Sequence, residues 1–412
     1  MDPERISRNQ QSLHDADLKA VVCALPSNVL LLSGYWPVAG TSIAICVRDG
    51  PTMLLVPEDE AGLAEDGFAD SIETFVPETL EQISSVSQAV KPHLAQTLKK
   101  LDINSGLIGI ESESSSHAAS YLSLHLYGNE LRAMLQEFLP NATFAPIDDW
   151  MRTTRSVKTA TELGKIRQAC AIAKNAFETA APTLHAGMNE PEAAQSFRAP
   201  LARGVFGLPI QRSDGFAFCM SGPNSAKAYA AYARTRQRKL ERTDLVMMHC
   251  NSYVDGFWTD ITRTYTLQPP DKKQERMYSA VFLARNAALS AIKPGVRAAA
   301  VDAIARHAIQ ECWLGHSIKH GTGHGVGLSA MSGYSIPRIH SSSPDILQEG
   351  MVFNVEPAVY IEQYGGVRHC DMVAVTHEGY ELLTEFQSDV KSLTVTNRNL
   401  MVEPQIRSGN AF

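Results

Sequence analysis

The pattern of apolar and polar positions changes character near residue 150. Before that point, short apolar runs alternate with Gly, Pro and Asp, which predicts the strands of a mixed sheet. Two stretches with apolar residues three and four positions apart predict helices. The strand-like runs are 17–25, 28–35, 42–47, 52–56 and 107–110, and the helical stretches are 78–101 and 117–138. We therefore expect an α/β domain over residues 1–152.

The pattern from residue 158 onward predicts helices packed against an antiparallel sheet. Thr159-Ala-Thr-Glu162 is a capping pattern that begins one helix, and Asn189 precedes a second helix with proline in its first turn. A third helix is amphipathic and covers 295–313. A β-prone hairpin at 244–267 and a strand-rich tail at 350–384 supply the sheet. Helices gathered on one side of an antiparallel sheet make an α+β layer, expected here over 158–400.

The hairpin is the first place where candidate chemistry enters the pattern. An apolar run, Leu245–Met248, leads to a turn signal at Asp255-Gly256, and a second β-prone run follows. If the chain reverses there, His249 lies across from Asp260, directly or diagonally. Cross-strand neighbours are about 4.5–5.5 Å apart at Cβ, close enough to share one metal ion or one proton. An ordinary hairpin with a polar outer face is the alternative.

Composition narrows the classes of protein that fit this pattern. A chain of 412 residues, 44% hydrophobic and 20% charged, is typical of a soluble globular protein with two domains. Its net charge of −7 and lack of a basic stripe argue against nucleic acid as a partner. No apolar stretch approaches the roughly 20 residues of a membrane helix, and the charged N-terminus does not resemble a signal peptide. Seven cysteines without paired spacing predict reduced thiols in the cytoplasm.

A glycine-rich stretch, His320-Gly-Thr-Gly-His324-Gly-Val-Gly, supplies two further candidate side chains. Its glycines let the backbone approach neighbouring segments closely and leave the imidazoles free to turn into a cleft. No phosphate-binding lysine follows, so a nucleotide loop is excluded. We expect His320 and His324 to act in binding or catalysis.

The strand-rich tail holds the remaining candidates. Glu356 interrupts an apolar run, and a buried carboxylate requires a metal, an arginine or a proton as its partner. The segment 365–375 is expected to be one strand, in which alternation puts Arg368 and Cys370 on the same face. His369 and Asp371 would then face the other side.

The order of four motifs along the chain carries a resemblance. They are Asp-Ile-Thr-Arg-Thr, His-x-x-Gly-His-Gly-x-Gly-Leu, Gly-Met-Val-Phe-x-Val-Glu-Pro and Gly-Val-Arg. This order resembles the creatinase/prolidase/aminopeptidase P family, M24, strongly over about 150–385 and more weakly before it. The resemblance implies an α+β, pita-bread C-terminal domain with a smaller α/β N-terminal domain. It also implies a homodimer.

The resemblance further implies a metal site, but with substituted ligands. The family's metallopeptidases hold two divalent ions with two aspartates, one histidine and two glutamates. The corresponding positions here are His249, Asp260, His324, Glu356 and Cys370. Histidine therefore replaces the first aspartate, and cysteine replaces the last glutamate.

Charge decides what this altered set can hold. Asp260 and Glu356 carry −2, or −3 with a Cys370 thiolate, whereas the family's four carboxylates carry −4. A second closely spaced cation would be poorly neutralised. We therefore expect one transition metal ion per chain (zinc, iron, cobalt, manganese or copper) with ligands drawn from these five positions, and neither magnesium nor calcium.

The predicted reaction is hydrolysis of a C–N bond in a small amide, amidine or modified amino acid. Glu356 would move the proton, while His320 and Arg368 would steady an oxyanion or a substrate carboxylate. Tyr229 occupies a position where the family has a histidine; it can donate a hydrogen bond but cannot act as a base at neutral pH.

Three other functions remain open from the sequence. The first is an Xaa-Pro peptidase acting on dipeptide-like substrates. The second is a metal-free, creatinase-like amidinohydrolase or lyase that relies on Glu356 and on His324 as the base. The third is a non-catalytic binding protein of the same fold.

Overall fold

The structure is a computed structural model that describes residues 2–77, 85–112, 129–204, 207, 210–229, 235–331 and 335–396. Its contacts divide the chain into two compact units. The first comprises Met1–Lys165 with the short segments Asp255–Phe257 and Ser332–Ile336, and the second comprises the rest.

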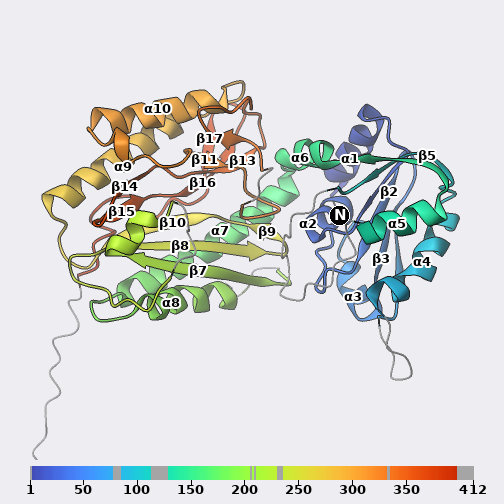
Figure 1. Ribbon diagram of the computed structural model, residues 1–412, viewed down its shortest axis with the longest axis horizontal. Coiled ribbons are helices and arrows are strands. Elements are labelled where there is room, and N and C mark those ends of the chain that lie inside the picture. Colours follow the sequence, from blue (N-terminus) through green and yellow to red (C-terminus); the bar gives the residue numbers. More distant parts are fainter. Residues whose placement is uncertain are drawn as a thin grey trace, which may run out of the picture. The chain divides into compact units, whose positions relative to one another are not determined.

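The first unit is built on a six-stranded mixed sheet with the order β4-β3-β2-β1-β5-β6 (Figure 1). Strand β1 pairs antiparallel with β2 and parallel with β5, so both kinds of pairing occur in one sheet, as the sequence predicts. The strands are β1 (Ala20–Cys23), β2 (Ile43–Val47), β3 (Thr52–Pro57), β4 (Ser71–Phe75), β5 (Ser105–Ile110) and β6 (Asn141–Pro146). Every residue of β1, β2 and β3 is buried, so both faces of this part of the sheet are covered.

Helices pack on this sheet. Two of them, α4 and α5, fall in the stretches where the helical spacing of apolar residues predicts them. Helix α4 packs against β4 and β3 and also contacts α5. The helices are α1 (Pro3–Asp15), α2 (Pro26–Ser33), α3 (Ala61–Ala64), α4 (Val86–Lys100), α5 (Asn129–Phe138) and α6 (Asp148–Ser156). Of the two predicted helical stretches, 78–84 and 117–128 lie outside the described residues. The remaining parts are helical.

The apolar run 28–35 is helical, so the prediction of a strand there is wrong. Pro26 occupies the first turn of α2, and Gly34 ends the helix with a φ of 74°. The carboxylate of Glu111 accepts hydrogen bonds from the backbone N–H of Ala24 and of Leu25, at the N-terminal end of the helix. The five buried apolar residues of this run, Val29 to Leu32 and Tyr35, fit a strand or a helix equally, and the features at the two ends of the helix distinguish them.

The second unit combines a twisted antiparallel sheet with four longer helices. Strands β10, β8 and β7 lie side by side, with β9 paired to β8. These strands are β7 (Ser213–Ser221), β8 (Leu245–Val254), β9 (Phe257–Trp258) and β10 (Ile261–Thr266). The helices are α7 (Ala160–Ala180), α8 (Glu190–Arg203), α9 (Lys272–Ser290) and α10 (Ala298–Glu311). Helix α8 packs on β7, and α10 packs on α9 (Figure 1).

The predicted starts of helices α7 and α8 are confirmed by their caps. The backbone N–H of Glu162 donates to Thr159 Oγ1, and that of Thr159 donates back to Glu162. Asn189 and Glu192 form the same reciprocal pair at the start of α8. Helix α9 has no counterpart in the prediction.

The tail contributes five short strands and two corrections. These are β13 (Val352–Val355), β14 (Ala358–Ile361), β15 (Gly365–Arg368), β16 (Asp371–Val375) and β17 (Tyr380–Leu382). The segment 365–375 was expected to be one strand, but β15 pairs with β14 and β16 pairs with β13, which breaks it at His369 and Cys370. Glu356 likewise lies between β13 and β14 rather than within a strand. Pro357, which has no N–H to donate, follows it.

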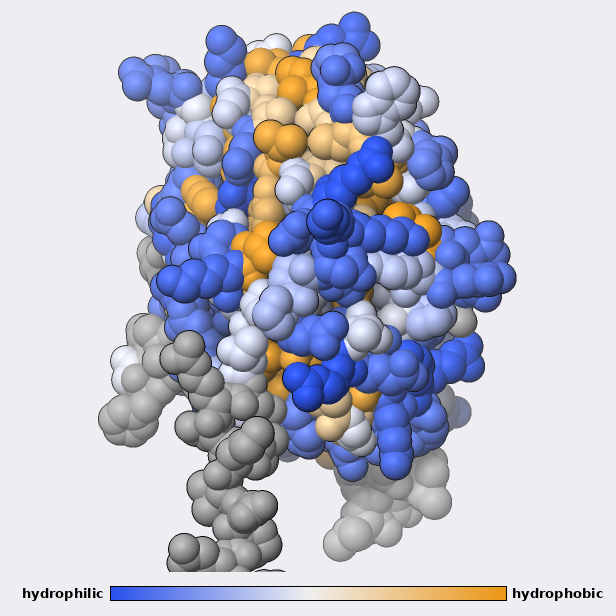
Figure 2. Space-filling model, turned by 90° about the vertical axis from the view of Figure 1, so that its left-hand side faces the viewer, coloured by the Kyte–Doolittle hydropathy of each residue, from blue (hydrophilic) through white to orange (hydrophobic). Residues whose placement is uncertain are grey.

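Figure 2 shows one face on which hydrophobic residues gather in the upper centre, surrounded by hydrophilic ones. Exposed large apolar side chains include Leu283 in α9 and Ile304 in α10. Among the residues that the structure describes, no helix has both the length and the apolar character needed to span a bilayer.

Candidate metal and catalytic site

The β8–β10 hairpin places the first two candidate residues. Asp255 and Gly256 have φ angles of 48° and 86°, the positive pair that a two-residue hairpin turn of type I′ requires. The register then sets His249 directly opposite Thr262. Asp260 lies two residues before Thr262 and therefore meets His249 diagonally, one of the two arrangements expected from the sequence.

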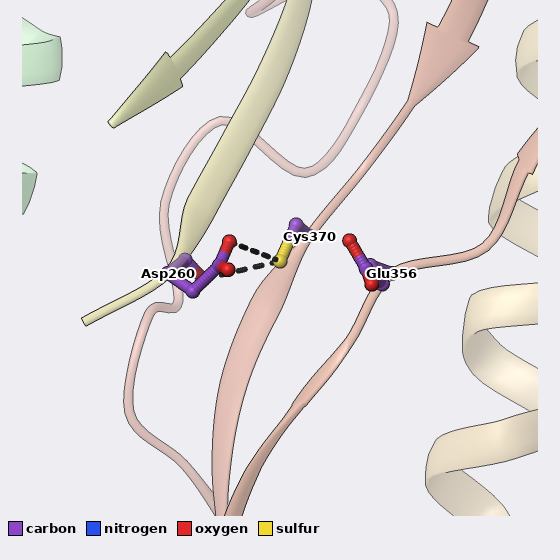
Figure 3. A group of neighbouring side chains, drawn as sticks. All are labelled: Asp260, Glu356 and Cys370. Atoms are coloured by element: carbon purple, nitrogen blue, oxygen red, sulfur yellow. Dashed lines mark hydrogen bonds between the residues drawn. The ribbon is translucent and has the colours of Figure 1, made fainter. Parts of the chain in front are cut away.

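Asp260, Glu356 and Cys370 form the centre of the site (Figure 3). One ligand atom from each lies within 4.8 Å of the others, and Cys370 stands between the two carboxylates in the view of Figure 3. The Sγ of Cys370 is 3.1 Å from the carbonyl oxygen of Asp260 and 3.5 Å from its Oδ1. Three of the five predicted ligand positions thus converge, although they come from three separate segments.

His324 faces this centre. Its Nδ1 is 3.2 Å from the carbonyl of Gly325, which can only accept, so Nδ1 carries the proton. Its Nε2 is then 3.5 Å from Asp260 Oδ2 and 3.9 Å from Glu356 Oε1, with the amide of Asn354 at 3.3 Å. The imidazole therefore directs Nε2 toward two carboxylates.

His249 lies beside the centre but has other partners. Its Nδ1 is 2.9 Å from Thr262 Oγ1, and its Nε2 is 3.1 Å from Asn251 Oδ1. The nearest carboxylate oxygen of Asp260 is 3.7 Å from Nδ1. The ring also stacks near Phe218, with centroids 6.1 Å apart.

Packed backbone holds the glycine-rich loop in place. A Cβ on Gly323 would lie 1.9 Å from the carbonyl oxygen of Asn354, so only glycine fits there. The buried carboxylate of Asp302 in α10 accepts from the N–H and the hydroxyl of Thr322. The carbonyl of Thr322 in turn accepts from the N–H of Glu356, at 2.7 Å. The segment 322–323 thus fixes the positions of the backbone at both His324 and Glu356.

A second group of side chains adjoins the centre. Arg368 is buried, and its Nε donates to Thr262 Oγ1 at 3.1 Å. Its Nη2 has no hydrogen-bond partner among the residues that the structure describes. His320 contacts the carbonyl of Gly321 through Nδ1 and the hydroxyl of Tyr360 through Nε2, at 2.9 Å.

Tyr360 is the residue that the sequence reasoning missed. It stands four positions after Glu356 in the Val-Glu-Pro motif, and that spacing was the available signal. Its ring lies 5.5 Å from that of Tyr229, which is 44% exposed, and 5.6 Å from the His320 ring. Burial raises the pKa of Tyr360 to about 12, so it acts as a hydrogen-bond donor at neutral pH.

The pKa directions at the centre follow from burial and charge. Burial raises the pKa of Cys370 well above its ordinary value, and the charges of Asp260 and Glu356 raise it further. Burial opposes ionisation of Asp260 as well, but His249 and His324 lower its pKa. The pKa of His324 is raised, because Asp260 and Glu356 outweigh the effect of burial. The raised pKa values of Cys370 and His324 both reflect the negative charge of Asp260 and Glu356.

The residues present fit one soft divalent ion. Two carboxylates, a thiol and an imidazole are the donors that zinc and related transition ions take, and they are too few in oxygen for calcium. A cation would also release the thiol proton and complete the charge balance. The set lacks the four carboxylates that would neutralise two closely spaced ions.

Asp371 and Arg263 do not join this centre. Asp371 is fully buried and accepts from Arg263 Nη2 at 2.6 Å and from Arg285 Nε. Arg263 also donates to the carbonyl of Cys370, at 2.8 Å. The expected alternation is thus found, since Cys370 faces Asp260 while Asp371 faces the arginines.

Two family models match the chain. The model described as the Creatinase/Prolidase N-terminal domain matches residues 5–157, and that of Metallopeptidase family M24 matches residues 164–377. The second match alone covers more than half of the 412 residues.

Individual relatives agree with these matches. A protein named Xaa-Pro dipeptidase from Pyrococcus horikoshii is 28% identical over 387 residues, which are 94% of this chain and 98% of the relative. A protein of the same name from Pyrococcus furiosus is 28% identical over 391 residues, 94% of this chain and 99% of the relative. The crystal structure of the prolidase from Pyrococcus horikoshii OT3 superposes with a TM-score of 0.75 at 26% identity, over 94% of this chain and 99% of that one. The fold inferred from the motifs is confirmed, and this chain belongs to metallopeptidase family M24, as an enzyme of the kind that hydrolyses C–N bonds.

Proposed function

We propose that this enzyme hydrolyses a C–N bond in a small amide, amidine or modified amino acid and holds one divalent transition metal ion per chain. The observation that carries the proposal is the convergence of Asp260, Glu356 and Cys370 within 4.8 Å, with His324 directed at the carboxylates. When bound, such an ion polarises the scissile carbonyl and makes a water molecule easier to deprotonate.

Proton transfer falls to Glu356. Its side chain is 13% exposed, more than that of Asp260 or His324, so it is more open to water than they are. The carboxylate takes a proton from the attacking water and returns it to the leaving nitrogen, so the proton balance closes within one turnover.

Binding and charge stabilisation fall to the adjoining group. The unpaired Nη2 of Arg368 offers a donor to an oxyanion or a substrate carboxylate, and a buried unpaired guanidinium nitrogen is costly unless a ligand uses it. The His320–Tyr360 hydrogen bond presents a second polar group, beside which Tyr229 forms an exposed aromatic wall.

An Xaa-Pro dipeptidase is the second candidate, because relatives of that name match nearly the whole chain. The substitutions at His249, Cys370 and Tyr229 weigh against ordinary dipeptidase activity. The metal-free amidinohydrolase or lyase and the non-catalytic binding protein remain as outcomes of the experiment below.

One experiment separates these functions. The protein is purified without added metal, its metal content is measured, and it is assayed on Xaa-Pro dipeptides, creatine and cyclic amidines with and without a chelator. One tightly held ion, turnover of a non-dipeptide substrate and loss of turnover with chelator are expected. Two tightly held ions with efficient Xaa-Pro cleavage would replace the proposal by the dipeptidase, and turnover that resists the chelator would replace it by the metal-free enzyme.

The resemblance to M24 proteins also leads us to propose a homodimer in the cytoplasm. Light scattering on the purified protein tests the assembly, and a molar mass near 45 kDa, that of one chain, would contradict it.

A further inference from the structure

Two histidines occupy family ligand positions in this chain, but the structure gives them different partners. His324 directs Nε2 at Asp260 and Glu356, whereas His249 uses both ring nitrogens in hydrogen bonds to uncharged side chains. His249 Nδ1 also lies 3.7 Å from Asp260 Oδ1, but that nitrogen is 2.9 Å from the hydroxyl of Thr262. The Nε2 of His324 has only a longer contact, 3.3 Å from the amide of Asn354, besides the two carboxylates.

The proton positions around His249 follow from its partners. Asn251 Nδ2 donates to the carbonyl of Thr259, so the amide oxygen of Asn251 is the atom that faces His249. Because that oxygen can only accept, Nε2 of His249 carries the proton. A neutral imidazole then has its lone pair on Nδ1.

Thr262 uses that lone pair. Its hydroxyl accepts from Arg368 Nε at 3.1 Å, so its own proton is free to be donated to His249 Nδ1 at 2.9 Å. The opposite tautomer would set the Nε2 lone pair of His249 against the amide oxygen of Asn251. The bonds therefore run in one direction, from Arg368 through Thr262 and His249 to Asn251.

From this chain of hydrogen bonds we infer that His249 stays outside the metal coordination and works as a positioning residue for Arg368. The metal ligands are then Asp260, His324, Glu356 and Cys370. The inference deepens the proposed function and rests on its metal ion.

Two features of the structure favour this division. Asp260, Glu356, Cys370 and His324 already supply four donors without His249, and a fifth protein ligand would compete with the position that a hydrolytic metal ion keeps open for water. To coordinate an ion through Nδ1, His249 would have to give up the hydrogen bond from Thr262. The hydroxyl of Thr262, which accepts from Arg368, would then no longer be held in one orientation. His324 would give up only the long 3.3 Å contact between its Nε2 and the amide nitrogen of Asn354. The amide oxygen of Asn354 would still accept from the backbone N–H of His324.

The test compares two matched variants, His249→Gln and His324→Gln, with the unsubstituted protein and with the variant Cys370→Ser. Metal-free protein is titrated with Co²⁺, which reports a bound thiolate through a charge-transfer absorption band. The unsubstituted protein and His249→Gln should each bind one ion with the same band. His324→Gln should weaken binding by more than the roughly 10–100-fold typical of outer-shell residues, and Cys370→Ser should lose the band.

Nitrogen NMR of histidine-labelled protein gives a readout that a purely structural role would not move. The His249 signals, assigned by their loss in His249→Gln, should keep the Nε2–H tautomer when Zn²⁺ is added, while the His324 signals shift. Thr262→Val should alter the His249 Nδ1 signal by removing its donor.

The possible outcomes distinguish the role inferred for His249 from the proposed binding of a metal ion. Equal loss of metal in His249→Gln and His324→Gln, or a Zn²⁺-dependent shift of His249 Nδ1, would overturn the inference while the proposed metal enzyme stands. An unsubstituted protein that binds no ion would overturn the proposed function and the inference with it.

Discussion

Cys370 and Asp371 are neighbours in the chain, yet they belong to two buried clusters of opposite character. Around Asp371, two arginines and the hydroxyl of Thr384 donate to one carboxylate. Around Cys370, two carboxylates and a thiol converge with no lysine or arginine paired to them in the described residues. The first cluster balances its charge from within the protein. In the second, the two carboxylates of Asp260 and Glu356 exceed the single charge of the adjoining Arg368, which supports the proposed binding of a cation.

The energetic roles of the clusters differ accordingly. Arg263 is fully buried, and it ties β10 to Asp371 and to the carbonyls of Thr384 and Phe386. Removing one partner from such a network leaves an uncompensated buried charge. The cluster around Cys370 should tolerate loss of one side chain far better, because its carboxylates are not paired with a lysine or an arginine among the described residues.

The largest expected effect is therefore on stability, from Asp371→Asn. Two buried guanidinium groups would lose their counter-charge, and the free energy of unfolding should fall by about 3–5 kcal/mol. Urea unfolding followed by tryptophan fluorescence measures this change.

Cys370→Ser, one residue earlier, is the matched control. Serine keeps a donor toward the Asp260 carbonyl, so the metal-free protein should lose no more than about 1 kcal/mol. Equal destabilisation by the two variants would remove the distinction between the clusters.

The next effect is on catalysis, from Tyr360→Phe. His320 Nε2 would lose its hydroxyl partner, and if this pair stabilises developing charge, kcat should fall by about 100-fold. The assay is steady-state kinetics on whichever of the proposed test substrates the enzyme turns over. The variant Tyr380→Phe, on β17, is the control. If Tyr360→Phe kept its full kcat, the His320–Tyr360 hydrogen bond would have no role in catalysis, and Tyr360 would contribute only packing.

A further effect, on the pH dependence of stability, extends the comparison to a buried carboxylate in the first unit. Burial raises the pKa of Glu111 from 4.5 to about 7, despite hydrogen bonds from Ala24 and Leu25. Between these values the folded state binds more protons than the unfolded state, so stability falls as pH rises from about 4.5 to 7. The slope from this group is at most about 1.4 kcal/mol per pH unit.

Glu111→Gln should remove that slope, and Glu130→Gln, an exposed position on α5, should leave it unchanged. Urea unfolding midpoints at several pH values measure both. A slope that persists in Glu111→Gln would show that another group produces it, which would contradict the role assigned to Glu111.

Local signals in the sequence were enough for much of the fold. Capping pairs such as Thr159 with Glu162 depend on residues three apart, and the turn at Asp255-Gly256 depends on two residues that accept positive φ. Motif order was enough for the family and for the positions of Asp260, His324 and Glu356. The run 28–35 was misread because the contact from Glu111, about 80 residues away, decides its helix.

What the tertiary structure alone decided is how the candidate side chains are used. The sequence placed His249 and His324 at two of the five expected ligand positions, and it does not show which groups each imidazole meets. Asn251 lies two residues from His249 on β8, but Thr262 comes from β10, and the partners of His324, Asp260 and Glu356, come from other segments. The direction of a lone pair depends on these neighbours, and only the packed sheet brings the neighbours together.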